Sequence, residues 1–281
     1  MSVSADIRDQ QRIIWDHFAA GWKKWDEKLL GWQRPFGDAM LKDIRLRRDS
    51  TVLDVASGTG EPGLSAAAAV PDGRVVLADI SAGMLHVAEL KASALGLANV
   101  SCSVCEAADL PFDDATFDAV LCRFGFQYFP EPRAALQEMV RTAKPGGRVS
   151  AAVWGRAGQN PWVTLVLGAL AQHSELPRPP AGTLGLFRCS TPGFMTRVFR
   201  DAGLVEVAER TVSTDLVTDS PESYWEFMLD IAPTVAMGLA RADQEAQGLI
   251  RSDVFQLLGR YEHQGAIRLR STATIVSGTR P

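Results

Sequence analysis

Short apolar runs alternate with stretches of helical spacing through the middle of the chain. The apolar runs at 51–55, 75–79, 100–104 and 116–121 predict four strands, and Lys144–Val149 leads into a fifth. Helical patterns lie between them, so residues 41–154 alternate between strand and helix. This alternation is typical of an α/β protein in which helices cover a doubly wound parallel sheet.

The flanking segments predict further elements outside this core. Residues 6–46 read as helices, because apolar side chains recur there at near-helical spacing. Beyond residue 154 we expect helices at 161–173 and 191–202, and a strand at 205–212. Two helical stretches within 220–261 and a last strand at 266–277 complete the expected elements.

The small-residue turn after the first strand is the most informative motif. Residues 58–63 match G-x-G-x-x-G, and the second strand ends on Asp79. Small residues let a backbone approach a ligand closely, and an acid at the end of the second strand can accept hydrogen bonds from a ribose. These features predict a nucleoside-containing cofactor at the carboxyl edge of the sheet.

The nucleoside could belong to a dinucleotide or to S-adenosylmethionine. Asp54 ends the first strand and Glu61 lies in the following turn, where negative charge would oppose a pyrophosphate. These acids suit a ligand with an ammonium and a sulfonium group. A buried Asp54 that only hydrogen-bonds the turn would be compatible with either cofactor.

Four spaced motifs extend the pattern: LDVASGTG, VLADIS, DLPFDDATFDAV and KPGGRV. On these motifs, which span about residues 50–153, the chain resembles the class I S-adenosylmethionine-dependent methyltransferases, especially the ubiquinone/menaquinone-biosynthesis (UbiE-like) type. The resemblance implies a Rossmann-like doubly wound seven-stranded sheet, mostly parallel with an antiparallel edge strand, plus a helical lid. It implies one methyltransferase domain over 1–281, divided into an N-terminal helical cap (1–46), a cofactor-binding core (47–154) and completing strands (155–281) with a lid insertion at about 217–263.

The resemblance also implies the residues that hold the cofactor. Asp54 and the backbone of 56–60 would hold the methionine part, Asp79 the ribose, and Asp109 the adenine amino group. Arg123 would lie where cofactor and acceptor meet. Ala56 departs from the glycine found in many relatives. The full implied set is Asp54, Ala56, Ser57, Gly58, Gly60, Asp79, Ile80, Met84, Ala108, Asp109, Leu110 and Arg123.

The helices outside the core carry many aromatic residues, which would suit a hydrophobic small-molecule substrate. About two-thirds of these residues are expected to be ordinary core. The substrate-binding candidates are Trp15, Phe18, Phe126, Tyr128 and Trp154. Methyl transfer requires mainly alignment and exclusion of water, so no general base is assigned, and the catalytic candidates are His17, Tyr128 and His173.

Composition limits the other partners. A net charge of −4 and a pI near 5.6 give no general attraction for nucleic acid. Cys102 and Cys105 form C-x-x-C without a second pair at zinc spacing, so no metal site is predicted. Without a secretory leader or an apolar stretch long enough to cross a bilayer, we expect a cytoplasmic protein without membrane insertion. A homodimer is compatible with the sequence.

The sequence thus favours a methyltransferase that produces S-adenosylhomocysteine and methylates an oxygen or carbon of a hydrophobic natural product or quinone-like molecule. One alternative is a protein that binds the cofactor but catalyses a non-methylating reaction such as cyclisation. A further alternative is an NAD-dependent oxidoreductase.

Overall fold

A mixed eight-stranded sheet forms the centre of the computed structural model, which describes residues 3–174 and 184–281. Its strand order is β3-β2-β1-β4-β5-β8-β6, with the short β7 paired to β8. The strands are β1 (Thr51–Val55), β2 (Arg74–Asp79), β3 (Val100–Val104), β4 (Phe117–Arg123), β5 (Ala143–Trp154), β6 (Val205–Thr218), β7 (Glu262–His263) and β8 (Ala266–Thr279).

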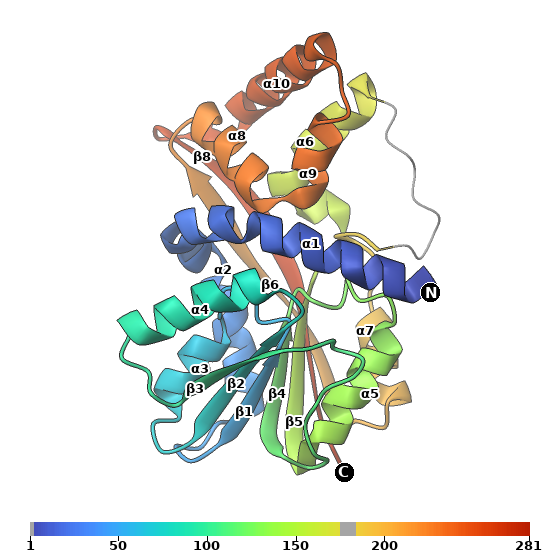
Figure 1. The fold of residues 1–281 in the computed structure, drawn as a ribbon. Coiled ribbons are helices and arrows are strands. Elements are labelled where there is room, and N and C mark those ends of the chain that lie inside the picture. Colours follow the sequence, from blue (N-terminus) through green and yellow to red (C-terminus); the bar gives the residue numbers. More distant parts are fainter. Residues whose placement is uncertain (1–2, 175–183) are drawn as a thin grey trace.

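Helices cover both faces of this sheet and form a separate layer above it (Figure 1). α2, α3 and α4 pack on one face, and α5 and α7 on the other. The helices are α1 (Val3–Lys24), α2 (Asp26–Ile44), α3 (Gly63–Ala69), α4 (Ala82–Ala94), α5 (Pro132–Thr142), η1 (Ala157–Gln159), α6 (Pro161–His173), α7 (Phe194–Asp201), α8 (Pro221–Ile231), α9 (Pro233–Leu239), α10 (Gln244–Leu258) and η2 (Gly259–Tyr261).

The pairing confirms the predicted fold class. β1 is parallel to β2 and β4, so the carboxyl ends of these strands meet at one edge. β8 runs antiparallel between β5 and the outermost strand β6. The interior strands are apolar and buried because helices lie on both sides of them.

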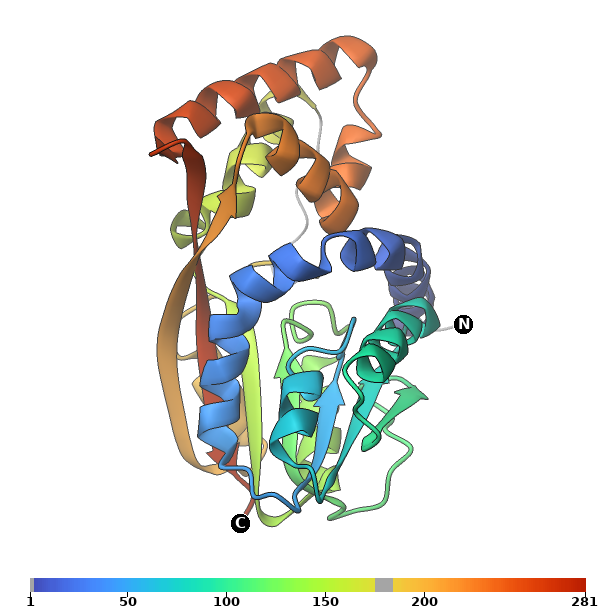
Figure 2. The same ribbon diagram turned by 90° about the vertical axis from the view of Figure 1, so that its left-hand side faces the viewer.

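The strands β6 and β8 carry the upper helices on their extended ends. Figure 2 shows both strands rising from the base of the sheet to the helical layer. The helices α8, α9 and α10 are inserted between them, and α6 lies beside α10. We call α6 and α8–α10 the lid helices.

The structure corrects two expected boundaries. β6 ends at Thr218 rather than at residue 212, because Ser213–Thr218 continue the antiparallel ladder with β8. The segment 220–261 holds three α-helices instead of two. Pro233 begins α9 directly after the extended Ala232, and a proline fits the first turn of a helix but not its interior.

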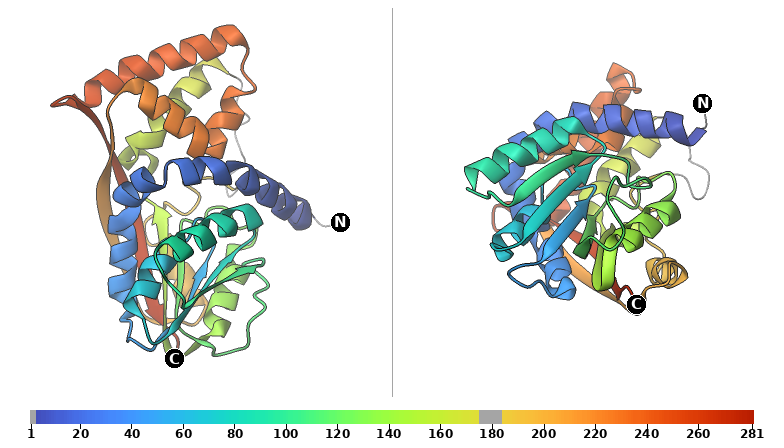
Figure 3. Two further views of the ribbon diagram at one scale, coloured as in Figure 1. Left: turned by 60° about the vertical axis from the view of Figure 1, so that its left-hand side comes forward. Right: turned by 60° about the horizontal axis from the view of Figure 1, so that its bottom comes forward.

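The helix α1 crosses the carboxyl edge of the sheet between α4 and the lid helices (Figure 3). Asp16 Oδ1 accepts hydrogen bonds from Ser81 Oγ at 2.6 Å and from the Gly83 amide at 3.0 Å, at the start of α4. On the other side, Trp22 Nε1 donates to the Ile231 carbonyl, and Lys24 pairs with Asp230 at 2.7 Å. α1 is therefore fastened to both the sheet region and the lid.

Candidate active site

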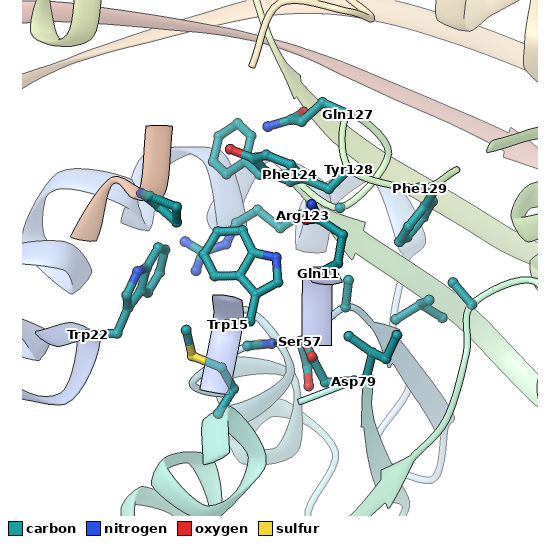
Figure 4. Close-up of a pocket in the computed structure, with 18 of the residues that line it drawn as sticks. Gln11, Trp15, Trp22, Ser57, Asp79, Arg123, Phe124, Gln127, Tyr128 and Phe129 are labelled. Atoms are coloured by element: carbon teal, nitrogen blue, oxygen red, sulfur yellow. Dashed lines mark hydrogen bonds between the residues drawn. The ribbon is translucent and has the colours of Figure 1, made fainter. Parts of the chain in front are cut away.

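A cavity of about 1300 Å³, including the space at its open mouth, lies where the strands β1, β2 and β4 end. α1 supplies one wall and the lid helices another. Figure 4 shows Trp15 in the middle of this cavity, Ser57 and Asp79 on one side of it, and Gln127 and Tyr128 on the other. This position at the carboxyl edge of a doubly wound sheet is where such folds bind ligands.

The turn after β1 places backbone groups at the floor of the cavity. Ala56 has a φ of +55°, the left-handed region in which glycine is the least strained residue. This gives a physical reason for the glycine that the resemblance implies at this position. Gly63 donates its amide to Asp54 Oδ2 at 2.8 Å, and a Cβ on Gly63 would lie 2.9 Å from that oxygen. The first amide of α3 is therefore already bound by a carboxylate and is not free for a pyrophosphate.

Asp79 binds the same turn from the end of β2. Its Oδ2 accepts from the Gly58 amide at 2.8 Å and its Oδ1 from the Ser81 amide at 2.9 Å. Asp79 also lines the cavity, so the carboxylate remains within reach of a ligand. Burial raises the pKa of Asp79, while the backbone donors oppose that rise.

Acidic groups outnumber basic ones at this end of the cavity. Burial raises the pKa of Asp54 to about 7, although Arg123 acts to lower it. Burial lowers the pKa of Arg123 against the opposing effects of Glu61 and Asp54. Glu61 and Glu106 line the cavity as well, and burial raises the pKa of Glu106. This excess of carboxyl groups favours a cationic ligand.

The segment after β3 places Glu106 at the cavity, not Asp109. Cys105, Glu106, Ala107 and Leu110 line the wall. Asp109 is exposed and Ala108 half-buried, and neither is among the lining residues. Glu106 is not among the residues predicted from the sequence, although it lies in the same short segment as Asp109 and also carries a carboxyl group.

Aromatic residues form the opposite part of the cavity. Trp15 contacts Tyr128 edge-to-face with ring centroids 5.2 Å apart, and Phe124 stacks on Trp154 at 4.0 Å with 9° between the rings. Further lining residues of this part are Trp22, Trp32, Gln33, Gln127, Phe129, Trp162, Leu186 and Ile231–Thr234. Burial raises the pKa of the Tyr128 phenol, so Tyr128 is a neutral hydrogen-bonding group at physiological pH.

Most of the predicted site residues come together here. Ala56, Ser57, Gly58, Asp79, Ile80, Met84, Leu110, Arg123, Trp15, Tyr128 and Trp154 line the cavity. Asp54 and Gly60 lie buried in and after β1, outside the lining set.

Other predicted residues lie elsewhere. Phe18 packs with Met84 between α1 and α4, and Phe126 packs on Phe129 and Phe199 in the core. His17 is exposed, and His173 joins α6 to α10 through a 2.7 Å contact with Asp253. Their predicted roles stay predictions.

Three buried side chains near the cavity have polar atoms without a hydrogen-bond partner in the described part of the chain. They are Asp54 (Oδ1), Ser57 (Oγ) and Gln127 (both Oε1 and Nε2). Buried polar atoms are almost always paired in native proteins, so such atoms beside a cavity indicate a ligand. Asp54 and Ser57 lie at the acidic end and fit a cofactor with an ammonium group.

Comparisons with known proteins match the middle of the chain to methyltransferases. Residues 52–147 match the family model described as a methyltransferase domain. A demethylmenaquinone methyltransferase from Thermus thermophilus is 36% identical over 157 residues, which cover 56% of this chain and 59% of the relative. A ubiquinone/menaquinone biosynthesis C-methyltransferase from Idiomarina loihiensis is 42% identical over 106 residues, covering 37% of this chain and 42% of the relative. The chain thus spans about half the length of these curated relatives.

Among solved structures, the YcgJ protein of Bacillus subtilis superimposes with a TM-score of 0.56 at 21% identity, over 87% of this chain and 97% of that one. This likeness shows the fold. Residues 52–147 are thus similar to a methyltransferase domain, within a fold that is similar to that solved structure. Among methyltransferases, the chain is similar to the ubiquinone/menaquinone-biosynthesis type, as the motifs predicted.

Proposed function

We propose that the protein transfers a methyl group from S-adenosylmethionine to an oxygen or carbon of a hydrophobic, quinone-like or natural-product ring. The observation that carries this proposal is the division of one cavity into an acidic end at the glycine turn and an aromatic end under the lid helices. The acidic end suits a cationic nucleoside, and the aromatic end suits a flat apolar acceptor.

Each end has a separate task in this proposal. Ser57 and the Gly58 backbone would hold the methionine part above Asp54, and Asp79 would accept from the ribose hydroxyls. S-adenosylmethionine supplies an activated methyl group. The chain has to align the acceptor with it and exclude water, which α1 and the lid helices do by covering the strand ends.

Methyl-labelled S-adenosylmethionine tests the proposal directly. Incubated with a panel of hydroxylated naphthalene and quinol acceptors, the protein should yield a labelled acceptor and one S-adenosylhomocysteine for each methyl group transferred. Consumption of an acceptor without loss of the label would instead favour cyclisation or another non-methylating reaction. Binding of NAD(H) without binding of S-adenosylhomocysteine would favour the oxidoreductase.

Replacing Asp79 with alanine should weaken S-adenosylhomocysteine binding by about 10- to 100-fold, because hydrogen bonds to charged groups contribute about 1.5 to 3 kcal/mol each. Titration calorimetry would measure it. Asp72→Ala is the matched control, since Asp72 is an exposed acid that pairs with Arg48 and lies outside the cavity lining. Equal affinities in the two variants would contradict the ribose assignment.

The expected position of the adenine ring gives a second prediction. Since Glu106 lines the cavity and Asp109 does not, Glu106→Ala should cost about 5- to 10-fold in affinity and Asp109→Ala less than 2-fold. S-inosylhomocysteine, which lacks the adenine amino group, should bind the wild type more weakly than S-adenosylhomocysteine does. Glu106→Ala should abolish that preference. Loss of the preference in Asp109→Ala alone would restore the assignment made from the motif.

Three expectations stay predictions within this proposal: a cytoplasmic location, the absence of a nucleic-acid partner, and a homodimer. In the described residues, no helix combines the length and apolar character needed to cross a bilayer.

A further inference from the structure

Gln127 is a buried amide whose side chain has no hydrogen-bond partner among the described residues. It lies in the loop between β4 and α5, its side chain is fully buried, and it is part of the cavity wall. Neither Oε1 nor Nε2 has a hydrogen-bond partner in the part of the chain that the structure describes. Leaving such groups unpaired destabilises a folded protein, so their presence beside a cavity requires an explanation.

A second buried amide shows that the fold satisfies such groups elsewhere. Asn160 Nδ2 donates to three carbonyls, those of Gly155, Arg156 and Thr272. Its Oδ1 accepts from Trp162 Nε1 and from the Thr272 amide. The unpaired state of Gln127 is therefore not a general property of buried amides in this chain.

The surroundings of Gln127 define what could pair with it. In Figure 4, Gln127 lies on the same side of the cavity as Phe124 and Tyr128, away from Ser57 and Asp79. Phe124 and Trp154 are stacked face to face, and both line the cavity, so they form an aromatic wall there. A planar ring can lie against such a wall, whereas a flexible chain gains less from it.

The hydrogen-bonding groups of the amide define which polar groups the ligand must carry. A glutamine side chain presents one acceptor and one donor group side by side in a plane. Its complement is a ligand with a donor beside an acceptor, such as a lactam N–H next to its carbonyl, or a ring hydroxyl next to a carbonyl. A ligand that carries only one of the two leaves a buried polar atom unpaired.

We propose that Gln127 selects the acceptor by a pair of hydrogen bonds to a planar ring that carries a donor and a carbonyl oxygen on neighbouring atoms. That this ring is the molecule methylated rests on the proposed function. Gln127 is then a specificity-determining residue, distinct from those that hold the cofactor at the acidic end.

Binding of a matched pair of probes tests this proposal. 2-Quinolone has the adjacent N–H and carbonyl, and N-methyl-2-quinolone has the same ring with the donor blocked. With S-adenosylhomocysteine present, quenching of tryptophan fluorescence should show the wild type binding 2-quinolone at least about tenfold more tightly. In Gln127→Leu this preference should disappear, so that the two probes bind about equally. The affinity for N-methyl-2-quinolone should change by less than twofold.

Stability gives an independent readout. Without ligand, Gln127→Leu should melt a few degrees higher than the wild type, because leucine removes the two unpaired groups. Asn160→Leu is the matched control and should melt lower, because it breaks a satisfied network. A purely structural Gln127 would lower the melting temperature when replaced.

The outcomes separate the two proposals. If the wild type binds S-adenosylhomocysteine but shows no preference between the probes, or binds neither probe, the role of Gln127 is overturned and the proposed function stands. An unchanged preference in Gln127→Leu also overturns it. If calorimetry shows no binding of S-adenosylhomocysteine, the proposed function fails, whatever Gln127 does.

Discussion

Replacing Trp32 with alanine is expected to lower the free energy of unfolding by about 3 to 5 kcal/mol, the cost of removing a large aromatic side chain from a core. Trp32 lies on α2 and is 3% exposed. Its ring lies against Trp154 of β5, Trp162 of α6 and Phe227 of α8, with centroids 4.7 to 6.0 Å apart. One side chain thus joins the sheet to two lid helices.

The hydrogen bond of Trp32 adds to this effect. Its Nε1 donates to Ser271 Oγ of β8 at 2.8 Å within the core. Trp32→Phe keeps most of the packing but removes this bond, so it should lose only about 1 to 2 kcal/mol. Urea unfolding followed by circular dichroism would measure both variants.

Leu249→Ala is the control for Trp32→Ala, since Leu249 is 47% exposed on α10 and should change stability by less than about 0.5 kcal/mol. A Trp32→Ala protein as stable as this control would mean that the lid helices do not depend on the aromatic cluster. Because Trp32 also lines the cavity, acceptor binding should weaken in step with the loss of packing.

The sheet and the acidic end of the cavity could be predicted because local patterns encode them. Buried parallel strands are short apolar runs, and the carboxyl ends of adjacent parallel strands necessarily share an edge. Asp79 and the turn at Ser57 and Gly58 were therefore placed together correctly by chain order alone.

The aromatic end was harder to predict, because an aromatic residue suits a core and a pocket equally well. Phe126 and Phe124 are two positions apart, but only Phe124 lines the cavity. Phe124 has a φ of +61°, which redirects the chain after β4, and no sequence pattern signals that conformation. Gln127 belongs to no motif, and what distinguishes it is burial without a hydrogen-bond partner among the described residues.

Asp54 connects the acidic end of the cavity to the pH dependence of stability. Its native pKa of about 7 lies above the ordinary value of 3.8 because of burial. The native state therefore binds this proton more tightly than the unfolded chain does. The stabilisation from the protonated carboxyl is complete below about pH 4, declines as the pH rises toward 7, and is absent above that.

Asp54→Asn has no titratable group at this position. Its free energy of unfolding should therefore increase relative to that of the wild type as the pH rises. At about 1.4 kcal/mol for each pKa unit, the gain between pH 4.5 and pH 8 should be about 3 kcal/mol. Urea unfolding at pH 4.5, 6 and 8 would measure it. Asp54 Oδ1 has no hydrogen-bond partner among residues 3–174 and 184–281, and the asparagine amide would lack one at the same place. That cost does not vary with pH and leaves the gain unchanged.

The same proton links Asp54 to the cofactor. A cationic ligand stabilises the ionised carboxylate, so the affinity of the wild type for S-adenosylmethionine should rise between pH 5.5 and pH 8, and that of Asp54→Asn should rise less. Asp79 and Glu106 also have raised pKa values, but both proteins contain them. Their effect therefore largely cancels when the affinities of the wild type and Asp54→Asn are compared.

A difference in unfolding free energy between the two proteins that is equal at pH 4.5 and pH 8 would contradict this. It would show that Asp54 has the same pKa folded and unfolded. The Gly63 amide and Arg123 would then fully compensate its burial, and the acidic end would already carry that negative charge before the cofactor arrives.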